Sequence, residues 1–187
     1  AGAPLNAISL DTTRPLSVAV LAMGGQGGGV LVDWIVALAE GNGYFAQSTS
    51  VPGVAQRTGA TIYYVEMIPA PPEGLGLTPV LSLMPVPGEV DVVIGAELME
   101  AGRAMLRGLV SPDRTTLIAS SHRSYAVQEK VVPGDGLADP AKVYAAAGEA
   151  AKRFLAFDMA ELAERNGSVV SAVLFGALAA SGALPFG

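Results

Sequence analysis

The stretch SVAVLAMGGQGGGVLVDWIVALAEG, residues 17–41, decides the fold of this 187-residue chain. Residues 17–23 form a short, uninterrupted apolar run, which is typical of a β-strand covered on both faces. Five glycines follow within the six positions 24–29. Apolar residues then recur at helical spacing, and the helix that they predict ends at Gly41. A strand, a glycine loop and a helix in this order indicate an α/β fold.

Two β patterns follow this unit. Residues 44–49 predict a second strand, and TIYYVEMI at 61–68 is the strongest β signal in the chain. No helix fits between them, because proline and glycine make the connecting residues irregular. We therefore expect an antiparallel neighbour or a long return loop here.

The middle of the chain returns to strand-helix-strand order. Residues 90–96 predict a strand, 97–109 a helix and 115–120 another strand. This order is typical of a right-handed crossover between parallel strands. The predicted fold class is therefore α/β, a layered Rossmann-like sheet flanked by helices, mostly parallel with an antiparallel or irregular section around residues 44–68.

Two helices are expected near the end of the chain. Asp139 is placed to cap a helix that starts at Pro140, and a final helix is expected over roughly 168–181. We divide the chain into an irregular leader, residues 1–15, and a single domain, residues 16–187. One face of the first of these helices is predicted to hold Val143, Tyr144, Ala147, Ala151, Phe154 and Leu155.

Composition excludes several kinds of chemistry. The formal charge of -6 gives no positive surface for a phosphate backbone, so nucleic acid is not an expected partner. The chain has no cysteine and one histidine, His122, so it supplies no thiolate for an iron-sulfur cluster, zinc site or nucleophile. We expect no metal site and no catalytic residue on this chain alone.

Targeting signals are not expected either. The first residues have neither a basic segment nor a long apolar one, which predicts a cytoplasmic protein rather than a secreted one. Residues 166–187 carry no charge, and their length would suit a membrane span. Small residues and Pro185 shorten the apolar helix, so we expect a buried or subunit-facing helix and no span.

The glycine loop is the strongest candidate site. Glycines between a strand and a helix let backbone N–H groups approach a ligand, and a helix N-terminus favours an anion such as a phosphate. The dinucleotide fingerprint G-x-G-x-x-G fits only with Ala22 as its first position, and residues 45–48 lack the acidic residue that holds a ribose. The P-loop signature GK[ST] is missing. Close packing of strand and helix is the alternative use of these glycines.

Three other polar features are weaker candidates. His122 follows a predicted strand. It could be a loop histidine whose hydrogen bonds are made by its neighbours, or it could be a catalytic histidine. Arg57, with Gln56, could bind a phosphate or carboxylate or could simply tie its loop to the backbone. The GDG at 134–136 resembles a thiamine diphosphate signature, but its surroundings read as a surface turn.

Three motifs in order carry a family resemblance. They are MGGQGGGVL at 23–31, SVPGVAQRTGATIYYVE at 50–66 and FLAFDMAELAERNGSVVSAVLFGAL at 154–178. Together they resemble the gamma-type subunit or domain of 2-oxoacid:ferredoxin oxidoreductases. The nearest branch is the beta subunit of indolepyruvate:ferredoxin oxidoreductase.

The resemblance implies a shared enzyme rather than a self-sufficient one. The complex would oxidatively decarboxylate a 2-oxoacid, here an arylpyruvate such as indolepyruvate, to an acyl-CoA with a ferredoxin-type acceptor. Thiamine diphosphate, Mg and Fe-S clusters are expected on a partner subunit or domain, and coenzyme A is the cofactor implied for this chain. The cofactor-binding residues that match the family are Gly24, Gly25, Gln26, Gly27, Gln56 and Arg57.

Two departures and two alternatives accompany this hypothesis. Ala22 stands where the family usually has glycine, and Ser171 where an asparagine is frequent. Relatives continue beyond residue 187, which predicts a fragment of a longer chain. The alternatives are a self-sufficient nucleotide-binding Rossmann-type protein and a non-catalytic interaction module whose apolar last helix docks a partner or forms a homo-oligomer.

Overall fold

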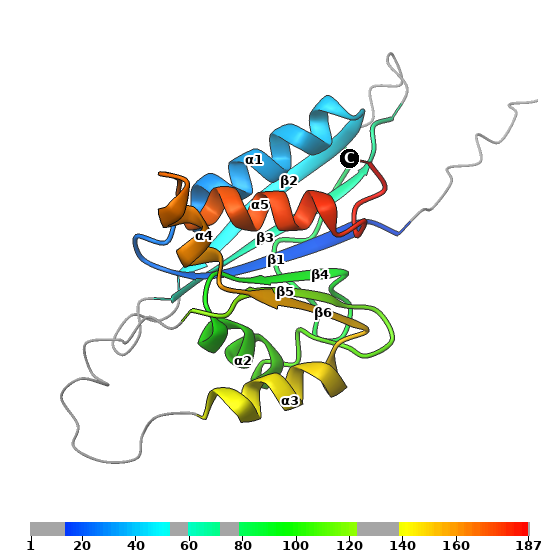
Figure 1. Cartoon of the computed structure of the whole chain (residues 1–187). Helices are drawn as coiled ribbons and strands as arrows, with labels where there is room; N and C mark the ends of the chain where they lie inside the picture. The colour runs from blue at the N-terminus through cyan, green and yellow to red at the C-terminus, as the bar shows by residue number, and fades with distance from the viewer. Residues whose placement is uncertain (1–13, 53–59, 72–78, 123–138, 187) are drawn as a thin grey trace, which may run out of the picture.

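A computed structural model describes residues 14–52, 60–71, 79–122 and 139–186. Within these residues six strands form one sheet in the order β2-β3-β1-β4-β5-β6, and five helices flank it (Figure 1). The predicted fold class is confirmed. The elements in chain order are β1 (Leu16–Met23), α1 (Gly28–Gly41), β2 (Tyr44–Pro52), β3 (Ala60–Pro69), β4 (Val92–Gly95), α2 (Leu98–Leu106), β5 (Thr116–Ser120), α3 (Pro140–Ala150), β6 (Arg153–Phe157), α4 (Met159–Arg165) and α5 (Val170–Ala180).

Four strands make the parallel part of the sheet. β1 pairs with β4, β4 with β5 and β5 with β6, all in parallel. The strands β4 and β5 are buried almost completely, because helices cover both faces of this part. Their carboxyl ends therefore meet at one edge of the sheet.

The antiparallel section lies where it was predicted. β3 runs antiparallel to both β1 and β2. Met23 at the end of β1 pairs with Ala60 at the start of β3, and Pro52 at the end of β2 pairs with Thr61. The glycine loop and the end of β2 thus lie at the same edge of the sheet.

Apolar side chains form one core on each face of the sheet. Figure 1 shows α1, α4 and α5 on one face and α2 and α3 on the other. Leu31, Ile35 and Leu174 fill the first core, and Leu117, Ala101 and Ala147 belong to the second. Because successive side chains of a strand point to opposite faces of the sheet, each strand contributes residues to both cores.

Helix α2 does not reach the β2–β3 part of its face, and the segment 79–90 covers it instead. Leu81 is buried there, and the Ser82 backbone N–H donates a hydrogen bond of 2.6 Å to Glu66 Oε2 on β3. The Tyr64 hydroxyl donates to the other oxygen of Glu66, at 2.5 Å. Burial, and secondly the hydrogen bond to Glu66, raises the pKa of Tyr64, so its phenol stays protonated. This buried network fixes the position of the segment.

The helix predicted from residue 141 onward is partly wrong. Helix α3 ends at Ala150, and Phe154 with Leu155 lies in strand β6. Phe154 still contacts Tyr144, with ring centroids 5.9 Å apart, because the strand returns beneath the helix. The four-residue apolar run 154–157 fits either a helix or a strand period, so only its pairing with β5 identifies it as a strand. The short helix α4 was not predicted.

Two other predictions for the last third, the cap of α3 and the last helix, are confirmed. Asp139 Oδ1 accepts a hydrogen bond of 2.9 Å from the Ala141 N–H, so it caps α3 as expected. Helix α5 falls inside the predicted range 168–181. Among the described helices, none is long and apolar enough to span a membrane. The leader up to residue 13 and the GDG at 134–136 lie outside the described residues.

Candidate functional site

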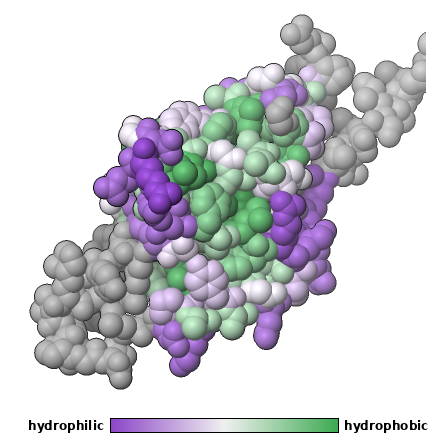
Figure 2. Space-filling view, viewed as in Figure 1, coloured by the Kyte–Doolittle hydropathy of each residue, from purple (hydrophilic) through white to green (hydrophobic). Residues whose placement is uncertain are grey.

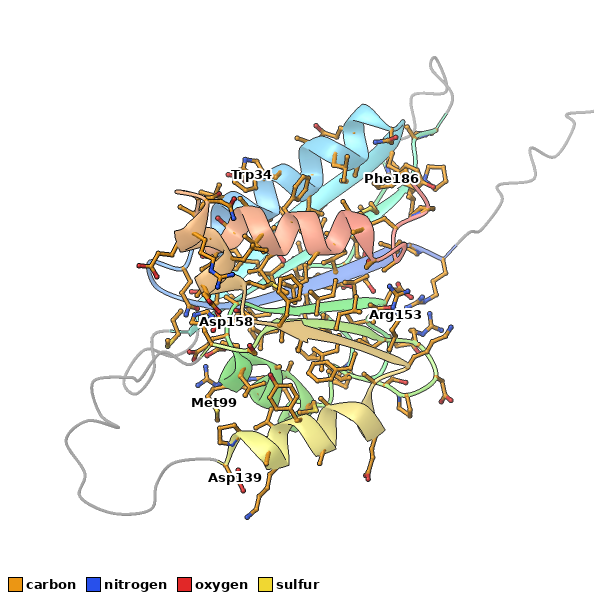
Figure 3. All side chains as sticks on the ribbon, in the orientation of Figure 1. Trp34, Met99, Asp139, Arg153, Asp158 and Phe186 are labelled. Atoms are coloured by element: carbon orange, nitrogen blue, oxygen red, sulfur yellow. The ribbon has the colours of Figure 1, made fainter. Side chains whose placement is uncertain are left out.

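The glycine loop lies at the carboxyl edge of the parallel strands, between β1 and α1. His122 follows β5 and Asp158 follows β6 at the same edge, as Figure 3 shows for Asp158 at the start of α4. Open α/β sheets bind ligands outside this edge. The structure therefore brings the loop and His122 to one side of the molecule.

Short-range hydrogen bonds give the loop its shape. The Gln26 N–H donates to the Met23 carbonyl at 3.1 Å, and Gln26 Oε1 accepts from the Met23 N–H at 2.8 Å. Gly25 and Gly27 have positive φ angles, 87° and 74°, which favour glycine. Thus the side chain of Gln26, expected to face a ligand, also holds the turn closed.

The glycines of the loop differ in what surrounds them. A Cβ on Gly28 would lie 2.6 Å from Tyr63 Cε2 and 2.8 Å from the Ala22 Cβ, and a Cβ on Gly27 would lie 2.9 Å from the Ser171 Oγ. At Gly24, by contrast, a Cβ would meet nothing within 4 Å. Close packing therefore explains the glycines at the helix start, whereas the tip of the loop is open.

The start of α1 can receive an anion. Gly27 is the N-cap, no side chain caps the helix, and its first turn carries no acidic residue. The first N–H groups of a helix have no partner within it, and the helix dipole adds partial positive charge. The backbone at this end of α1 supplies donors without help from a lysine or arginine.

An open hollow of about 610 Å³ adjoins the loop. Apolar side chains dominate its walls, and the exposed fractions of Val30, Trp34 and Val169 are 48%, 36% and 57%. The Trp34 ring contacts the ring of Phe175 of α5 edge-on, with the ring centroids 5.8 Å apart, and this contact holds the indole beside the hollow (Figure 3). The hollow is lined by Gly25, Gln26, Gly27, Val30, Trp34, His122, Ala160, Ala163, Glu164, Ser168, Val169, Val170 and Ser171.

The surface around the hollow is apolar on the side of α1 and α5 and hydrophilic on the side of α4. Figure 2 shows hydrophobic residues gathered over α1 and α5, with hydrophilic residues over α4. Glu164 of α4 is exposed, and among the described residues it is the only charged side chain in the lining. A ligand in the hollow would thus meet apolar walls, a helix N-terminus and one carboxylate.

The hydrogen bonds around His122 indicate a structural role for this residue. Its Nδ1 lies 2.6 Å from the Ser120 Oγ, which also accepts a hydrogen bond of 3.1 Å from the Met159 N–H. Ser120 is completely buried, so its hydroxyl is not accessible to a substrate. The loop histidine satisfied by its neighbours, one of the two readings of the sequence, is the one that this geometry favours. The pair anchors the start of α4 to β5.

The second predicted loop cannot be placed beside the first. Gln56 and Arg57 lie in residues 53–59, outside the described part of the chain. The strands on either side of this loop end at the edge that carries the glycine loop. Their role as ligand contacts stays a prediction.

Sheet order argues against the self-sufficient Rossmann alternative. In the dinucleotide fold the second strand lies parallel beside the first and carries the acidic residue for the ribose. Here the antiparallel β3 lies between β1 and β2. Residues 45–48 are thus one strand too far from the glycine loop, in addition to lacking a carboxylate.

Sequence reasoning missed the walls of the hollow. Trp34 lies in the predicted helix that ends at Gly41 and Val169 in the helix expected over 168–181, and only the packing of α5 against α1 shows that both stay exposed. Ser171, noted only as a departure from the family, is buried against Gly27. Among the described residues, no group of three His, Asp or Glu side chains could hold a metal ion.

The fold and the site define a Rossmann-like α/β domain that presents a glycine loop beside an apolar hollow. The profile of the pyruvate ferredoxin/flavodoxin oxidoreductase family matches residues 17–187, so the chain belongs to this family. The family resemblance drawn from the three motifs is confirmed at this level.

Solved structures with the same fold are distant in sequence. A pyruvate oxidoreductase subunit of Thermotoga maritima is 17% identical with a TM-score of 0.57, and the match covers 92% of this chain and 80% of that one. The gamma subunit of a keto/oxoacid ferredoxin oxidoreductase of Geobacter sulfurreducens is 16% identical with a TM-score of 0.54, covering 91% and 77%. No curated protein matches the chain.

Proposed function

We propose that this chain is the gamma-type subunit of a 2-oxoacid:ferredoxin oxidoreductase and that its glycine loop contributes the binding surface for coenzyme A. Family membership and the two subunit structures of the same fold support the first part. The start of α1, which has no capping side chain and lies beside an apolar hollow, carries the second part. The chain acts in the complex and is inactive by itself.

The division of labour follows from the side chains available. The chain has no cysteine, so the Fe-S clusters belong to partner subunits, and we place thiamine diphosphate with Mg there as well. Bound there, thiamine diphosphate would supply the decarboxylation of the 2-oxoacid. This chain would orient coenzyme A toward the acyl group, which yields an acyl-CoA, CO₂ and reduced ferredoxin. An arylpyruvate is the substrate that the resemblance favours.

Coenzyme A suits the mixed character of the site. Its phosphates would face the N–H groups at the start of α1, as anions do at helix N-termini. Its pantetheine arm is long and weakly polar, and it would lie along the apolar walls formed by Val30, Trp34 and Val169. The Glu164 carboxylate opposes a bound anion, so neutralising it is expected to tighten binding.

The single tryptophan reports directly on this proposal. Trp34 lines the hollow and is the only tryptophan in the chain, so coenzyme A binding is expected to change its fluorescence. The titration compares coenzyme A with NAD and pantetheine. Saturable quenching by coenzyme A that Glu164→Gln strengthens supports the site, and an unchanged spectrum up to millimolar coenzyme A contradicts it.

A matched pair of loop variants tests the role of the glycine loop. Gly24 has open surroundings and no positive φ, so Gly24→Asn and Gly24→Asp should both fold. Only the aspartate adds negative charge beside the helix start, and it should weaken coenzyme A binding several-fold at low salt. Equal binding by the two variants would show that the anion does not face this loop.

The subunit role is tested separately by purification of the tagged chain from the cells that make it. Co-purification of subunits that carry thiamine diphosphate and Fe-S clusters supports it. The purified complex is then assayed with indolepyruvate, phenylpyruvate and pyruvate to determine the 2-oxoacid. A chain that elutes alone and free of cofactors overturns the subunit role and favours an independent binding protein.

A further inference from the structure

Among the described residues, no strand pairs with the outer edge of the sheet at β2. β2 is nine residues long and stands at the end of the strand order, where β3 is its one partner in the described part of the chain (Figure 1). It contains no charged residue, and its one proline, Pro52, is its last residue. Proteins usually guard such edges with charge, proline, a bulge or a covering element, because a free edge invites another strand.

A polar hollow of about 200 Å³ borders this edge on the α1 side. Ser48 and Ser50 of β2, Tyr63 of β3 and Asp33 of α1 line it. Asp33 is exposed and makes no ion pair or hydrogen bond with the described residues. The Asp33 carboxylate attracts a cation and repels an anion, and the neighbouring hydroxyl groups supply further acceptors for the cation.

Exposed apolar side chains of the segment 79–90 border the same edge on the opposite face of the sheet. The Thr49 hydroxyl donates a hydrogen bond of 2.6 Å to the Leu83 carbonyl, which holds the segment 79–90 against β2. Leu83 and Met84 nevertheless remain 64% and 57% exposed. The bond between Ser82 and the buried Glu66 carboxylate keeps this segment in place. Large apolar side chains on a fixed segment are typical of an interaction surface.

We propose that the free edge of β2 is a docking site for an extended segment of a partner subunit, which adds a seventh strand to the sheet. This inference rests on the proposed role as a subunit. Side chains of a strand point alternately to its two faces. The added strand would therefore alternate, with lysine or arginine toward Asp33 and an apolar residue toward Leu83.

The charge pattern favours a partner segment over a second copy of this chain. A second copy would offer its own β2, which has no lysine or arginine and would leave Asp33 without a cation. In a segment whose basic and apolar residues alternate, the basic side chains would pair with Asp33 and the apolar ones would contact Leu83. Its backbone would form hydrogen bonds with the outward N–H and C=O groups of β2. Main-chain hydrogen bonds supply affinity in strand addition, and the flanking side-chain sites supply selectivity.

Hydrogen exchange measured by mass spectrometry tests the docking edge in the intact complex. The complex is purified with the tagged full chain, and its β2 peptide is compared with that of the isolated chain. Main-chain pairing should slow exchange of the outward amides of β2 at least tenfold in the complex. Complex formation with unchanged exchange over 44–52 overturns the inference and leaves the subunit role standing. Absence of any complex overturns the subunit role instead.

A photo-reactive amino acid at the exposed Ser50 identifies the occupant. The inference expects a cross-link to one partner segment in which basic and apolar residues alternate. A cross-link to a second copy of the same chain, or to an acidic or helical segment, contradicts it. So does a complex that assembles normally without any cross-link.

Paired substitutions test the two borders. Asp33→Asn should weaken association about two- to five-fold at low salt, as for exposed ion pairs, and the loss should vanish near 1 M salt. Glu149→Gln, at an exposed carboxylate on the opposite helical layer, is the matched control. Leu83→Ser should weaken association, whereas Leu106→Ser, at a leucine 91% exposed on α2, should not. Equal effects in both pairs contradict the docking site.

Discussion

Gly28→Ala tests whether packing dictates the glycine at the start of α1. The added methyl group would lie 2.6 Å from the Tyr63 ring and 2.8 Å from the Ala22 Cβ, which is fixed to the backbone of β1. Overpacking of this kind typically costs about 1 to 3 kcal/mol, and two contacts below 3 Å place it near the upper end. Replacing a helical glycine by alanine returns up to about 1 kcal/mol. The expected net loss is therefore about 2 kcal/mol.

Thermal unfolding and a double-mutant cycle measure this loss. In a domain of this size about 2 kcal/mol lowers the melting temperature by roughly 4 to 8 °C. Removing the opposing methyl group with Ala22→Gly should reduce the cost of Gly28→Ala by at least about 1 kcal/mol. Gly24→Ala, in open space, is the control and should leave stability unchanged or slightly higher. A Gly28→Ala variant as stable as the parent, or a cost independent of residue 22, refutes the packing argument.

Three further predictions concern buried and capping groups. Burial raises the pKa of Glu100 above its ordinary 4.5, so its contribution to stability is greatest below that pH and is lost as pH rises through the raised value. The melting temperature of Glu100→Gln relative to the parent should therefore increase with pH, whereas that of Glu161→Gln, at an exposed carboxylate, should change little. Asp139→Ala removes the cap of α3 and should cost about 1 kcal/mol in urea unfolding. Glu66→Ala leaves the Ser82 N–H and the Tyr64 hydroxyl without their partner, so limited proteolysis should cut within 79–90 faster, and cleavage at an unchanged rate would contradict the anchoring role.

Local patterns predicted the elements whose signals lie within a few residues of one another. The run 17–41 predicted β1, the glycine loop and α1, and Asp139 predicted the start of α3. Strand β6 was mistaken for the end of a helix, because five residues with two aromatic rings fit both periods. Its pairing with β5 is a long-range property that no local pattern carries.

The candidate site was predictable at its loop and not at its walls. The N-terminal end of α1 follows from the sequence, but the hollow exists because α4 and α5 pack beside that end. The same holds for the position of β3 between β1 and β2, which removes the ribose site of a dinucleotide fold. Which apolar residues of a helix remain exposed depends on neighbours that are distant in sequence.

The glycine run is weaker evidence for a ligand than its composition suggests. Positive φ angles require glycine at Gly25 and Gly27, and contacts with Tyr63 and Ala22 require it at Gly28. Backbone geometry and packing would therefore select most of the run without any ligand. Neither backbone geometry nor packing explains why the start of α1 has no capping side chain and lies beside a hollow lined by Trp34. A functional test should consequently change the charge at the open Gly24, since substitution at the other three positions would disturb the fold before it disturbed binding.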